Sequence, residues 1–415
     1  MSAAISPARV AAHAVLLRVF EEGAYADRAT RSATEGLDER DRALATQLAY
    51  GAVQRVRTLD FAIETLGKRP VAKLDPPVRA ALRLGAYQLG YLDGVPRYAA
   101  VNESVELVRR ARLERAVSFT NAVMRRVGEG IRDLVEALPD RTPTEAALRH
   151  SYPDWIVETF WRDLGPAAAV ACLRAQNEPM ETVVRRVRGD VAGEPTDVPC
   201  AIRVQRVDPM DVVAGRVWPQ SRASQVVGLA VGGRPGERIL DLCAAPGGKA
   251  TMLGGEVVAV EVNEGRAREL ERNIRQLRAA NVRVVHADGR SLPAELTGFD
   301  RALVDAPCSG LGVLAARPDL RWRAEPLPEL QLELLRAAIG RVRPGGTLVY
   351  SVCTLNRDEG EAIVDSVVGE GLVEIDAGLG GEWAQFRHPQ RPEFLLTLPH
   401  VHHTSGFFVA RLRTR

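Results

Sequence analysis

The chain has 415 residues, of which 46% are hydrophobic and 26% are charged, and its net charge is +2. This length and balance predict a globular protein of two or three domains, and the small net charge excludes a strong overall attraction to nucleic acid. No stretch approaches the roughly 20 apolar residues that a membrane helix needs. The five cysteines form no Cys-x-x-Cys pair, which argues against a zinc site and a disulfide framework. We therefore expect a protein of the reducing cytoplasm, with no metal and no membrane association.

Residues 1–140 are predicted to be helical throughout. Asp38 can cap a helix from Glu39 to Arg57, in which apolar residues repeat at helical spacing. The proline pair at 76–77 opens another helix, and Pro96 separates it from a further helix that starts at about Val101.

Arginines are frequent on the outer face of this last helix and on the one that follows: Arg109, Arg110, Arg112, Arg115, Arg125 and Arg126. A charged helix face is often only a solvated face. A compact arginine cluster can also hold RNA phosphates. The sequence leaves both interpretations open.

Residues 141–219 show a mixed pattern. Helices are predicted over Pro153–Leu164 and Pro166–Gln176, and strands over Val183–Val187 and Ala201–Val207. This segment has the size of a small α/β domain that links two larger ones.

From residue 220 the pattern changes to alternating strands and helices, which predicts a parallel, doubly wound sheet. Ligands bind such sheets beyond the carboxyl ends of their strands. Helices are predicted over Arg266–Ala279 and Leu327–Arg341. The predicted strands are Ile239–Leu242, Val257–Val260, Val282–Val285, Ala302–Val304 and Thr347–Tyr350.

A glycine-rich turn follows the first of these strands. It reads Cys243-Ala244-Ala245-Pro246-Gly247-Gly248-Lys249. It lacks the Gly-Lys-Ser/Thr of a phosphate-binding loop and the Gly-x-Gly-x-x-Gly of a dinucleotide site. A cofactor without a phosphate bridge, such as S-adenosyl-L-methionine, therefore fits better, although a tight turn without a ligand is the simpler alternative.

Acidic residues stand at the ends of three successive strands. Glu261 is placed to accept hydrogen bonds from ribose hydroxyls, and Asp288 to meet an adenine amino group. Asp305 ends the next strand and is followed by Pro307 and Cys308. One acid at a strand end is common, but three in register around a glycine-rich turn favour a binding site.

Two cysteines lie beyond strand ends, Cys308 in Asp305-Ala306-Pro307-Cys308 and Cys353 in Ser351-Val352-Cys353-Thr354. Either alone is often a small buried hydrophobic residue. Together they suggest thiol chemistry: a thiolate can add to C6 of a pyrimidine, so that C5 becomes nucleophilic enough to accept a methyl group. A second thiol nearby could help to resolve the adduct.

These motifs together resemble the Sun/Fmu-type RNA 5-methylcytosine methyltransferases, in particular those that act on 16S rRNA. The cofactor loop, the Pro-Cys motif and the second cysteine motif match closely, and residues 149–155 resemble the start of the family's linker region. The resemblance implies a NusB-like helical RNA-binding domain at 1–140, a small α/β linker domain at 141–219 and a Rossmann-like methyltransferase domain at 220–415.

The resemblance also implies roles. Cys353 would attack C6, Cys308 would assist breakdown of the adduct, and Asp305 would bind the base edge. S-adenosyl-L-methionine would be held by Cys243, Ala244, Ala245, Pro246, Gly247, Gly248, Lys249, Glu261, Arg266, Asp288 and Asp305. Residues 317–319 resemble a segment near the active site. The expected partner is RNA, as 16S rRNA or an assembling small subunit, and the expected state is a monomer.

The chain departs from the family pattern in one place that affects the cofactor site. Only Ala250 to Glu256 separate Lys249 from the next strand, so the first helix after the loop must be very short.

Two other functions remain open from the sequence. A DNA cytosine methyltransferase would use the Pro-Cys cysteine, Cys308, as nucleophile. A non-catalytic RNA-binding or antitermination factor would rely on the N-terminal domain alone.

Overall fold

The structure is a computed structural model, and it describes residues 5–415. The chain forms two compact units. The first contains the residues up to Asn177 together with Leu314–Arg323, and the second contains Glu178–Val313 and Ala324–Arg415. The three-domain division at 140 and 219 stays a prediction. Residues 141–177 belong to the first compact unit, and residues 178–219 belong to the second.

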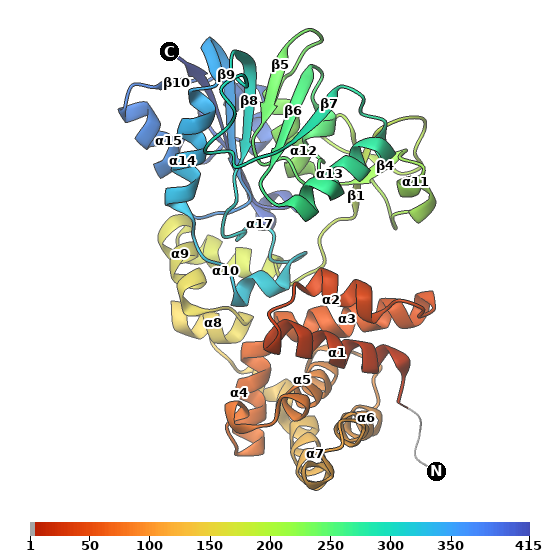
Figure 1. Cartoon of the computed structure of the whole chain (residues 1–415). Helices are drawn as coiled ribbons and strands as arrows, with labels where there is room; N and C mark the ends of the chain where they lie inside the picture. The colour runs from red at the N-terminus through yellow and green to blue at the C-terminus, as the bar shows by residue number, and fades with distance from the viewer. Residues whose placement is uncertain (1–4) are drawn as a thin grey trace. The chain divides into compact units, whose positions relative to one another are not determined.

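The first unit is helical, as the sequence predicts (Figure 1). Asp38 does cap α3, by accepting a hydrogen bond from the Asp41 backbone. The single helix predicted over 39–57 is wrong, because Arg55 leaves the helical conformation and a second helix begins at Val56. The N-terminal helices are α1 Pro7–Glu21, α2 Ala26–Ala33, α3 Glu39–Gln54, α4 Val56–Gly67, α5 Pro76–Tyr91, α6 Arg97–Arg110 and α7 Glu114–Glu136, with a short 3-10 turn η1 at Val71–Lys73.

The break at Arg55 lets both halves of the predicted helix bury their apolar faces. Leu48 and Val53 of α3 and Leu59 and Ile63 of α4 lie in one hydrophobic core. A straight helix presents one apolar stripe, whereas two helices at an angle can enclose a core from two sides.

Three further helices complete the first unit: α8 Pro143–His150, α9 Asp154–Leu164 and α10 Pro166–Ala175. Thr142 begins α8 with a capping box, in which its hydroxyl and Glu145 satisfy each other's backbone N–H groups. The helices predicted from residues 153 and 166 are confirmed.

The segment Leu314–Arg323 belongs to the first unit although it follows the Pro-Cys motif in sequence. It contains the 3-10 helix η3, Pro318–Trp322. Arg321 is its anchor, with only 1% of its surface exposed. Its guanidinium lies 3.9 Å from the centre of the Tyr152 ring.

No carboxylate of residues 5–415 pairs with Arg321. Its N–H groups donate instead to four oxygens: Gln54 O at 3.1 Å, Ser151 O at 3.3 Å, Asn177 Oδ1 at 2.8 Å and Gln176 O at 2.9 Å. Burial lowers its pKa to about 10, so the group remains charged near neutral pH.

The second unit contains a small antiparallel sheet and a large sheet. The small sheet has the order β2-β3-β1-β4, and its strand β3 ends at Arg203, earlier than the predicted Val207. Arg185 of β1 is buried and donates hydrogen bonds to Gly248 O and Thr251 Oγ1, both at 2.8 Å. The small sheet is therefore tied to the glycine-rich loop. Its elements are β1 Val183–Arg186, β2 Glu194–Pro195, β3 Ala201–Arg203, α11 Pro209–Val213 and β4 Val217–Pro219.

The large sheet has the order β10-β12-β9-β8-β5-β6-β7, with β11 paired to β12. Strands β5 to β9 are mutually parallel, as predicted, whereas β10, β11 and β12 pair in antiparallel fashion and were not predicted. The strands are β5 Arg238–Asp241, β6 Glu256–Glu261, β7 Val282–His286, β8 Phe299–Asp305, β9 Val342–Val352, β10 Val373–Ile375, β11 Leu395–Thr397 and β12 Phe407–Thr414.

Helices cover this sheet (Figure 1). Residues of α12 and α13 form one hydrophobic core with Ile239, Leu303 and Val349 of the sheet. Helix α14 packs against β8, β9 and α15. The helical elements are α12 Arg222–Val231, η2 Ala250–Met252, α13 Glu264–Leu277, α14 Pro328–Ile339, α15 Glu361–Gly369, α16 Leu379–Glu382, η4 Ala384–Phe386 and α17 Pro399–His402.

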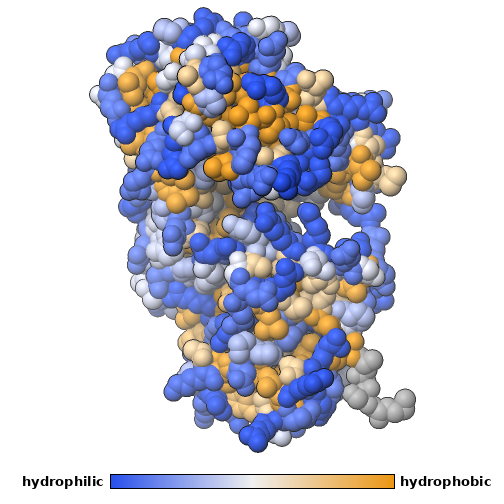
Figure 2. Space-filling view, viewed as in Figure 1, coloured by the Kyte–Doolittle hydropathy of each residue, from blue (hydrophilic) through white to orange (hydrophobic). Residues whose placement is uncertain are grey.

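Hydrophilic residues cover most of the face shown in Figure 2, and hydrophobic residues form separate patches there. Among the described residues, no helix is long and apolar enough to cross a membrane.

The anchor at Arg321 gives a first prediction. Arg321→Leu removes a donor from four oxygens, of which Gln176 O keeps another in Gln54 Nε2, and each oxygen left without a donor costs about 1–3 kcal/mol. We expect the free energy of unfolding to fall by about 3 kcal/mol or more, measured by urea denaturation. Arg323→Leu is the control, because Arg323 is exposed and donates only to Gly23 O; it should cost less than about 1 kcal/mol. Equal stability losses in the two variants would contradict the prediction.

Candidate functional site

The glycine-rich loop lies between β5 and β6, and neither of its two glycines has room for a side chain. Gly247 has φ +103°, and a Cβ there would lie 2.7 Å from Leu270 Cδ1. At Gly248 a Cβ would lie 2.9 Å from Trp218 Nε1. The helix after the loop is only the 3-10 turn Ala250–Met252, which confirms the expected short helix. The two glycines therefore let the loop pack closely against α13 and β4.

Glu261 ends β6, as predicted, and only 3% of its surface is exposed. It accepts a hydrogen bond from the Asn263 backbone at 2.9 Å and lies 3.4 Å from the Arg266 guanidinium. Arg266 also donates to Ala245 O at 3.0 Å. The arginine therefore links the glycine-rich loop to the end of β6.

Asp288 lies two residues beyond β7 and is paired with Arg290, whose Nη2 is 2.7 Å from Asp288 Oδ2. This hydrogen-bonded pair lowers the pKa of Asp288. Arg290 also contacts Glu333 at 3.0 Å. Arg290 makes four hydrogen bonds to this carboxylate, which is about the number that a carboxylate can accept, so a further donor has to displace one of them.

Asp305 ends β8 and has two partners. Lys249 Nζ lies 2.6 Å from Oδ2, and the Ser351 hydroxyl donates to Oδ1 at 2.7 Å. Burial would lower the pKa of Lys249, but the pair with Asp305 outweighs burial and raises it. Lys249 Nζ also lies 5.1 Å from the centre of the Phe407 ring. The lysine is therefore a fixed cation at the end of the sheet.

The two cysteines meet. Cys308 Sγ lies 3.4 Å from Cys353 Sγ, although 44 residues separate them in sequence. The adjacent strands β8 and β9 bring them together, because Asp305 is in register with Ser351. The hydrogen bond with Cys353, together with burial, raises the pKa of Cys308 well above its usual value. Cys308 is thus a thiol that keeps its proton near neutral pH.

One cavity of about 340 Å³ collects most of these groups. It brings together eight predicted site residues, namely Cys243, Ala245, Glu261, Arg266, Asp288, Asp305, Cys308 and Cys353. Ala244, Pro246, Gly247, Gly248 and Lys249 do not line it, although Lys249 reaches it through Asp305. Other lining residues include Leu330 and Leu334 of α14.

Asp241 was not predicted as a site residue. It ends β5, is 1% exposed, and neither of its carboxylate oxygens has a side-chain partner. Burial, followed by the nearby Asp305, raises its pKa to about 7. Because an unsatisfied buried carboxylate is costly, it indicates a place for a donor group that the protein itself does not supply. In the sequence, its position before the glycine-rich loop could have identified it as a site residue.

The thiol pair gives a second prediction, on pH. Alkylation by iodoacetamide requires a thiolate, and Cys353 raises the pKa of Cys308. Cys353→Ser removes the ionisable partner, so the pKa of Cys308 should fall and its alkylation should begin at lower pH. At pH 8 we expect roughly tenfold faster alkylation of Cys308, followed by peptide mass spectrometry. The buried Cys172, whose pKa burial raises to about 12, should stay unreactive. An unchanged pH profile for Cys308 would refute the coupling.

Comparison with known proteins places this site in a family. Residues 229–413 match the family described as 16S rRNA methyltransferase RsmB/F, and residues 6–129 match the NusB family. A probable ribosomal RNA small subunit methyltransferase B from Synechocystis is 33% identical and covers 98% of this chain and 99% of its own. Ribosomal RNA small subunit methyltransferase B from Thermus thermophilus is 38% identical over 86% of each chain.

Solved structures support the fold. The crystal structure of PH0851 covers 100% of both chains with a TM-score of 0.80 at 22% identity. NSun6 from Pyrococcus horikoshii, solved with SFG, covers 64% of this chain and 99% of its own, with a TM-score of 0.56 at 22% identity. The multidomain layout expected from the sequence, with helices first and a Rossmann-like α/β domain after them, is confirmed. Together with the matches along nearly the whole chain, this shows that the chain belongs to the RsmB/F family of 16S rRNA methyltransferases, with S-adenosyl-L-methionine as the methyl donor and a NusB-like region at its N-terminal side.

Proposed function

We propose that this rRNA methyltransferase forms 5-methylcytosine in 16S rRNA through a covalent bond between Cys353 Sγ and C6 of the base. The observation that carries the proposal is the pair of sulfurs 3.4 Å apart in the wall of the cavity that also holds Asp305 and Glu261. A single thiol would suffice to attack C6. Two in contact suit a reaction that must both form and resolve an adduct.

The residues present fit the cofactor. Cys243 and Ala245 of the glycine-rich loop line the cavity, and Asp241 offers two buried acceptor oxygens without side-chain partners. We propose that Asp241 accepts the cofactor's ammonium group, Glu261 the ribose hydroxyls and Asp288 the adenine amino group. The bound cofactor supplies an electrophilic methyl group to the cavity.

The protein's own groups then carry the remaining steps. The Cys353 thiolate adds to C6, and the electron pair moves to C5, which takes the methyl group. Asp305 holds the base edge, and the ion pair with Lys249 holds Asp305 in place. With Cys353 bonded to carbon, Cys308 gives up its proton to solvent, and the Cys308 thiolate takes the proton from C5. Elimination of the Cys353 thiolate then restores the aromatic ring. The target base must leave its stack for the thiol to reach C6.

The two alternatives left open by the sequence are weaker. A DNA cytosine methyltransferase would use Cys308 as nucleophile, yet Cys308 is the thiol whose pKa is raised. A non-catalytic RNA-binding factor has no use for a formed cavity with two thiols and an unsatisfied buried carboxylate. Both are distinguished from the proposal by the cysteine variants below.

The third prediction separates the two thiols. Cys353→Ala should reduce methyl transfer to deproteinised small-subunit rRNA by about 10⁴-fold or more, because the nucleophile is lost. Cys308→Ala should still form the adduct but resolve it slowly, so that a protein–RNA complex resistant to denaturation accumulates. Labelled cofactor measures the transfer, gel shift after denaturation detects the complex, and bisulfite sequencing maps the product. The reverse pattern would favour Cys308 as nucleophile, and transfer unchanged in Cys353→Ala would exclude this mechanism.

A basic surface in the first unit is the candidate for holding the RNA backbone. A cavity of about 480 Å³ is lined by Arg69, Lys73, Arg112 and Arg115, with Arg69 5.3 Å from the centre of the Phe119 ring. Within residues 5–415, none of these four cations forms an ion pair. Most other arginines of the unit do, including Arg109 with Glu106. A phosphate binds an unpaired cation at the lowest cost in free energy, because no existing ion pair has to be broken.

The fourth prediction tests this surface. Replacing Arg112 and Arg115 together by Gln should weaken binding to rRNA and lower the slope of log K against log salt by about 1–2, since each phosphate contact contributes about 0.7–0.9. The control is Arg141→Gln, because Arg141 is exposed and paired with Glu145. Filter binding at several salt concentrations measures the slope. A slope equal to that of the unmodified protein would show that these arginines do not contact the RNA.

The oligomeric state, expected to be a monomer, stays a prediction.

A further inference from the structure

The loop after Cys353 carries a carboxylate that none of the roles above uses. Glu359 is completely buried, with 0% of its surface exposed. Its Oε1 accepts hydrogen bonds from the Ser309 backbone at 2.9 Å, the Leu327 backbone at 3.1 Å and Gln331 Nε2 at 2.9 Å. Its Oε2 accepts from the Ser309 hydroxyl. Four donors thus converge on one side chain.

Two of the four donors belong to Ser309, in the segment that presents Cys308, and the other two lie at the start of α14. Ser309 follows Cys308 directly, and its hydroxyl also contacts Thr354 Oγ1, next to Cys353, at 2.9 Å. Gln331 donates both to Glu359 and to Pro307 O, at 2.9 Å. The carboxylate therefore bridges the Pro-Cys loop to the Cys353 loop, directly through Ser309.

The same carboxylate holds the start of α14. Leu327 caps this helix at its N-terminal end, and Leu330 and Leu334 of the helix line the cavity. The backbone carbonyl of Glu359 accepts a hydrogen bond from the buried Tyr350 hydroxyl at 2.6 Å, which fixes the loop to β9. One residue thus connects two thiol loops, one wall of the cavity and the sheet.

A purely structural contact at this place does not need a charge. No cationic side chain among residues 5–415 pairs with Glu359, and burial of an unpaired carboxylate is unfavourable unless hydrogen bonds compensate it. Its negative charge is also among the causes that raise the pKa of Cys308, after the hydrogen bond with Cys353, burial and the charge of Cys353. A group that is costly to bury and that acts on a reactive thiol is a candidate for a functional role.

We propose that Glu359 is a positioning residue for the two-thiol site, which holds the Cys308 loop against the Cys353 loop and keeps Cys308 as the protonated partner until the adduct has formed. This inference rests on the proposed function for the roles of the thiols. Glu359 touches neither base nor cofactor site directly and acts through Ser309 and Gln331. Misplacement of a reacting group by about 1 Å costs on the order of 100-fold in rate, so the bridge is expected to affect kcat.

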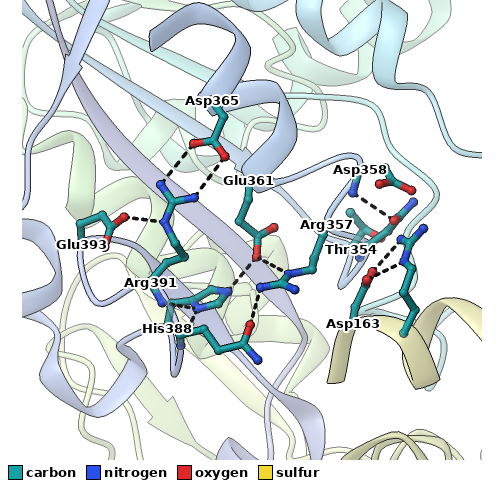
Figure 3. A network of polar contacts seen from close by, with 12 residues as sticks. Asp163, Thr354, Arg357, Asp358, Glu361, Asp365, His388, Arg391 and Glu393 are labelled. Atoms are coloured by element: carbon teal, nitrogen blue, oxygen red, sulfur yellow. Dashed lines mark hydrogen bonds and ion pairs between the residues drawn. The ribbon is translucent and has the colours of Figure 1, made fainter. Parts of the chain in front are cut away.

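A neighbouring carboxylate provides the matched control. Glu361 is also buried, at 8% exposure, but its side chain accepts from His388 Nε2 at 2.8 Å and lies 3.6 Å from Arg357 Nε. Figure 3 shows Glu361 directed toward His388 and Arg357, with Arg391 bound to Asp365 and Glu393 nearby. None of these contacts reaches Ser309 or Thr354. Glu361→Gln therefore removes a buried charge two residues away without touching the bridge.

The experiment compares Glu359→Gln, Glu359→Ala and Glu361→Gln in the full chain. Gln keeps the shape, and its carbonyl can still accept from the three donors on Oε1, so the fold should persist. We expect Glu359→Gln to lower kcat for rRNA methylation about tenfold with KM for RNA changed less than about twofold, and Glu359→Ala to lower kcat about 100-fold. With the charge gone, iodoacetamide should alkylate Cys308 about threefold faster at pH 8. Glu361→Gln should leave all three quantities within about twofold.

The proposal is overturned if folded Glu359→Gln keeps both the kcat and the Cys308 alkylation rate of the unmodified protein, or if Glu361→Gln produces the same losses. If the unmodified protein transfers no methyl group to rRNA, the proposed function fails, but the alkylation rates still decide the role of Glu359. Should Glu359→Gln not fold, Ser309→Ala removes one arm of the bridge and should lower kcat about threefold in a folded protein. An unchanged kcat in that variant would equally refute the bridge.

Discussion

The contact between two sulfurs at 3.4 Å is the constraint on which the site depends. Two negative charges at that distance repel by about 5 kcal/mol even at an effective dielectric constant of about 20. The pair therefore cannot be a double thiolate near neutral pH. At most one sulfur can ionise, and the other then donates a hydrogen bond to it, as in other coupled pairs of titratable groups. The surrounding charges decide which of the two sulfurs ionises more readily and which one donates the hydrogen bond.

Those charges are unequally placed. Lys249 is held beside Asp305, and interaction with Cys353 is one of the causes that raise the pKa of the lysine. Glu359 acts on Cys308 in the opposite sense. Once Cys353 has bonded to carbon, its charge and its hydrogen bond to Cys308 are both gone. The pKa of Cys308 must then fall, so that Cys308 can lose its proton to solvent and its thiolate can take the proton that has to leave C5. The same sulfur–sulfur contact thus raises the pKa of Cys308 before the adduct forms and no longer raises it afterwards.

The sequence predicted the parts of this arrangement that depend on local patterns. The parallel strands followed from apolar runs, and the ends of β6 and β8 at Glu261 and Asp305 followed from the acids that terminate them. Because neighbouring parallel strands end at one edge, the meeting of Cys308 and Cys353 could be anticipated as well. The antiparallel strand β12 could not, since its pairing with β9 depends on long-range contact rather than periodicity.

Buried polar residues were the main omission. Asp241, Arg321 and Glu359 each look like ordinary charged residues in the sequence, and charged residues are usually exposed. Only the structure shows that Arg321 donates to four carbonyl-type oxygens and that Glu359 accepts from four donors. The signal lies in partners that are distant in sequence, so no window of local sequence contains it.

The order of segments along the chain links these two residues. After the Pro-Cys motif the chain enters the first compact unit at Leu314, is anchored there by Arg321, and returns to the second unit at Ala324. Glu359 binds Ser309 before this excursion and Leu327 after it. The excursion from 310 to 326 therefore leaves and re-enters the second unit at residues that bind the same carboxylate, and the first of them, Ser309, directly follows Cys308. One buried side chain thus fixes the chain next to the thiol and the start of the helix that lines the cavity, which no local sequence pattern predicts.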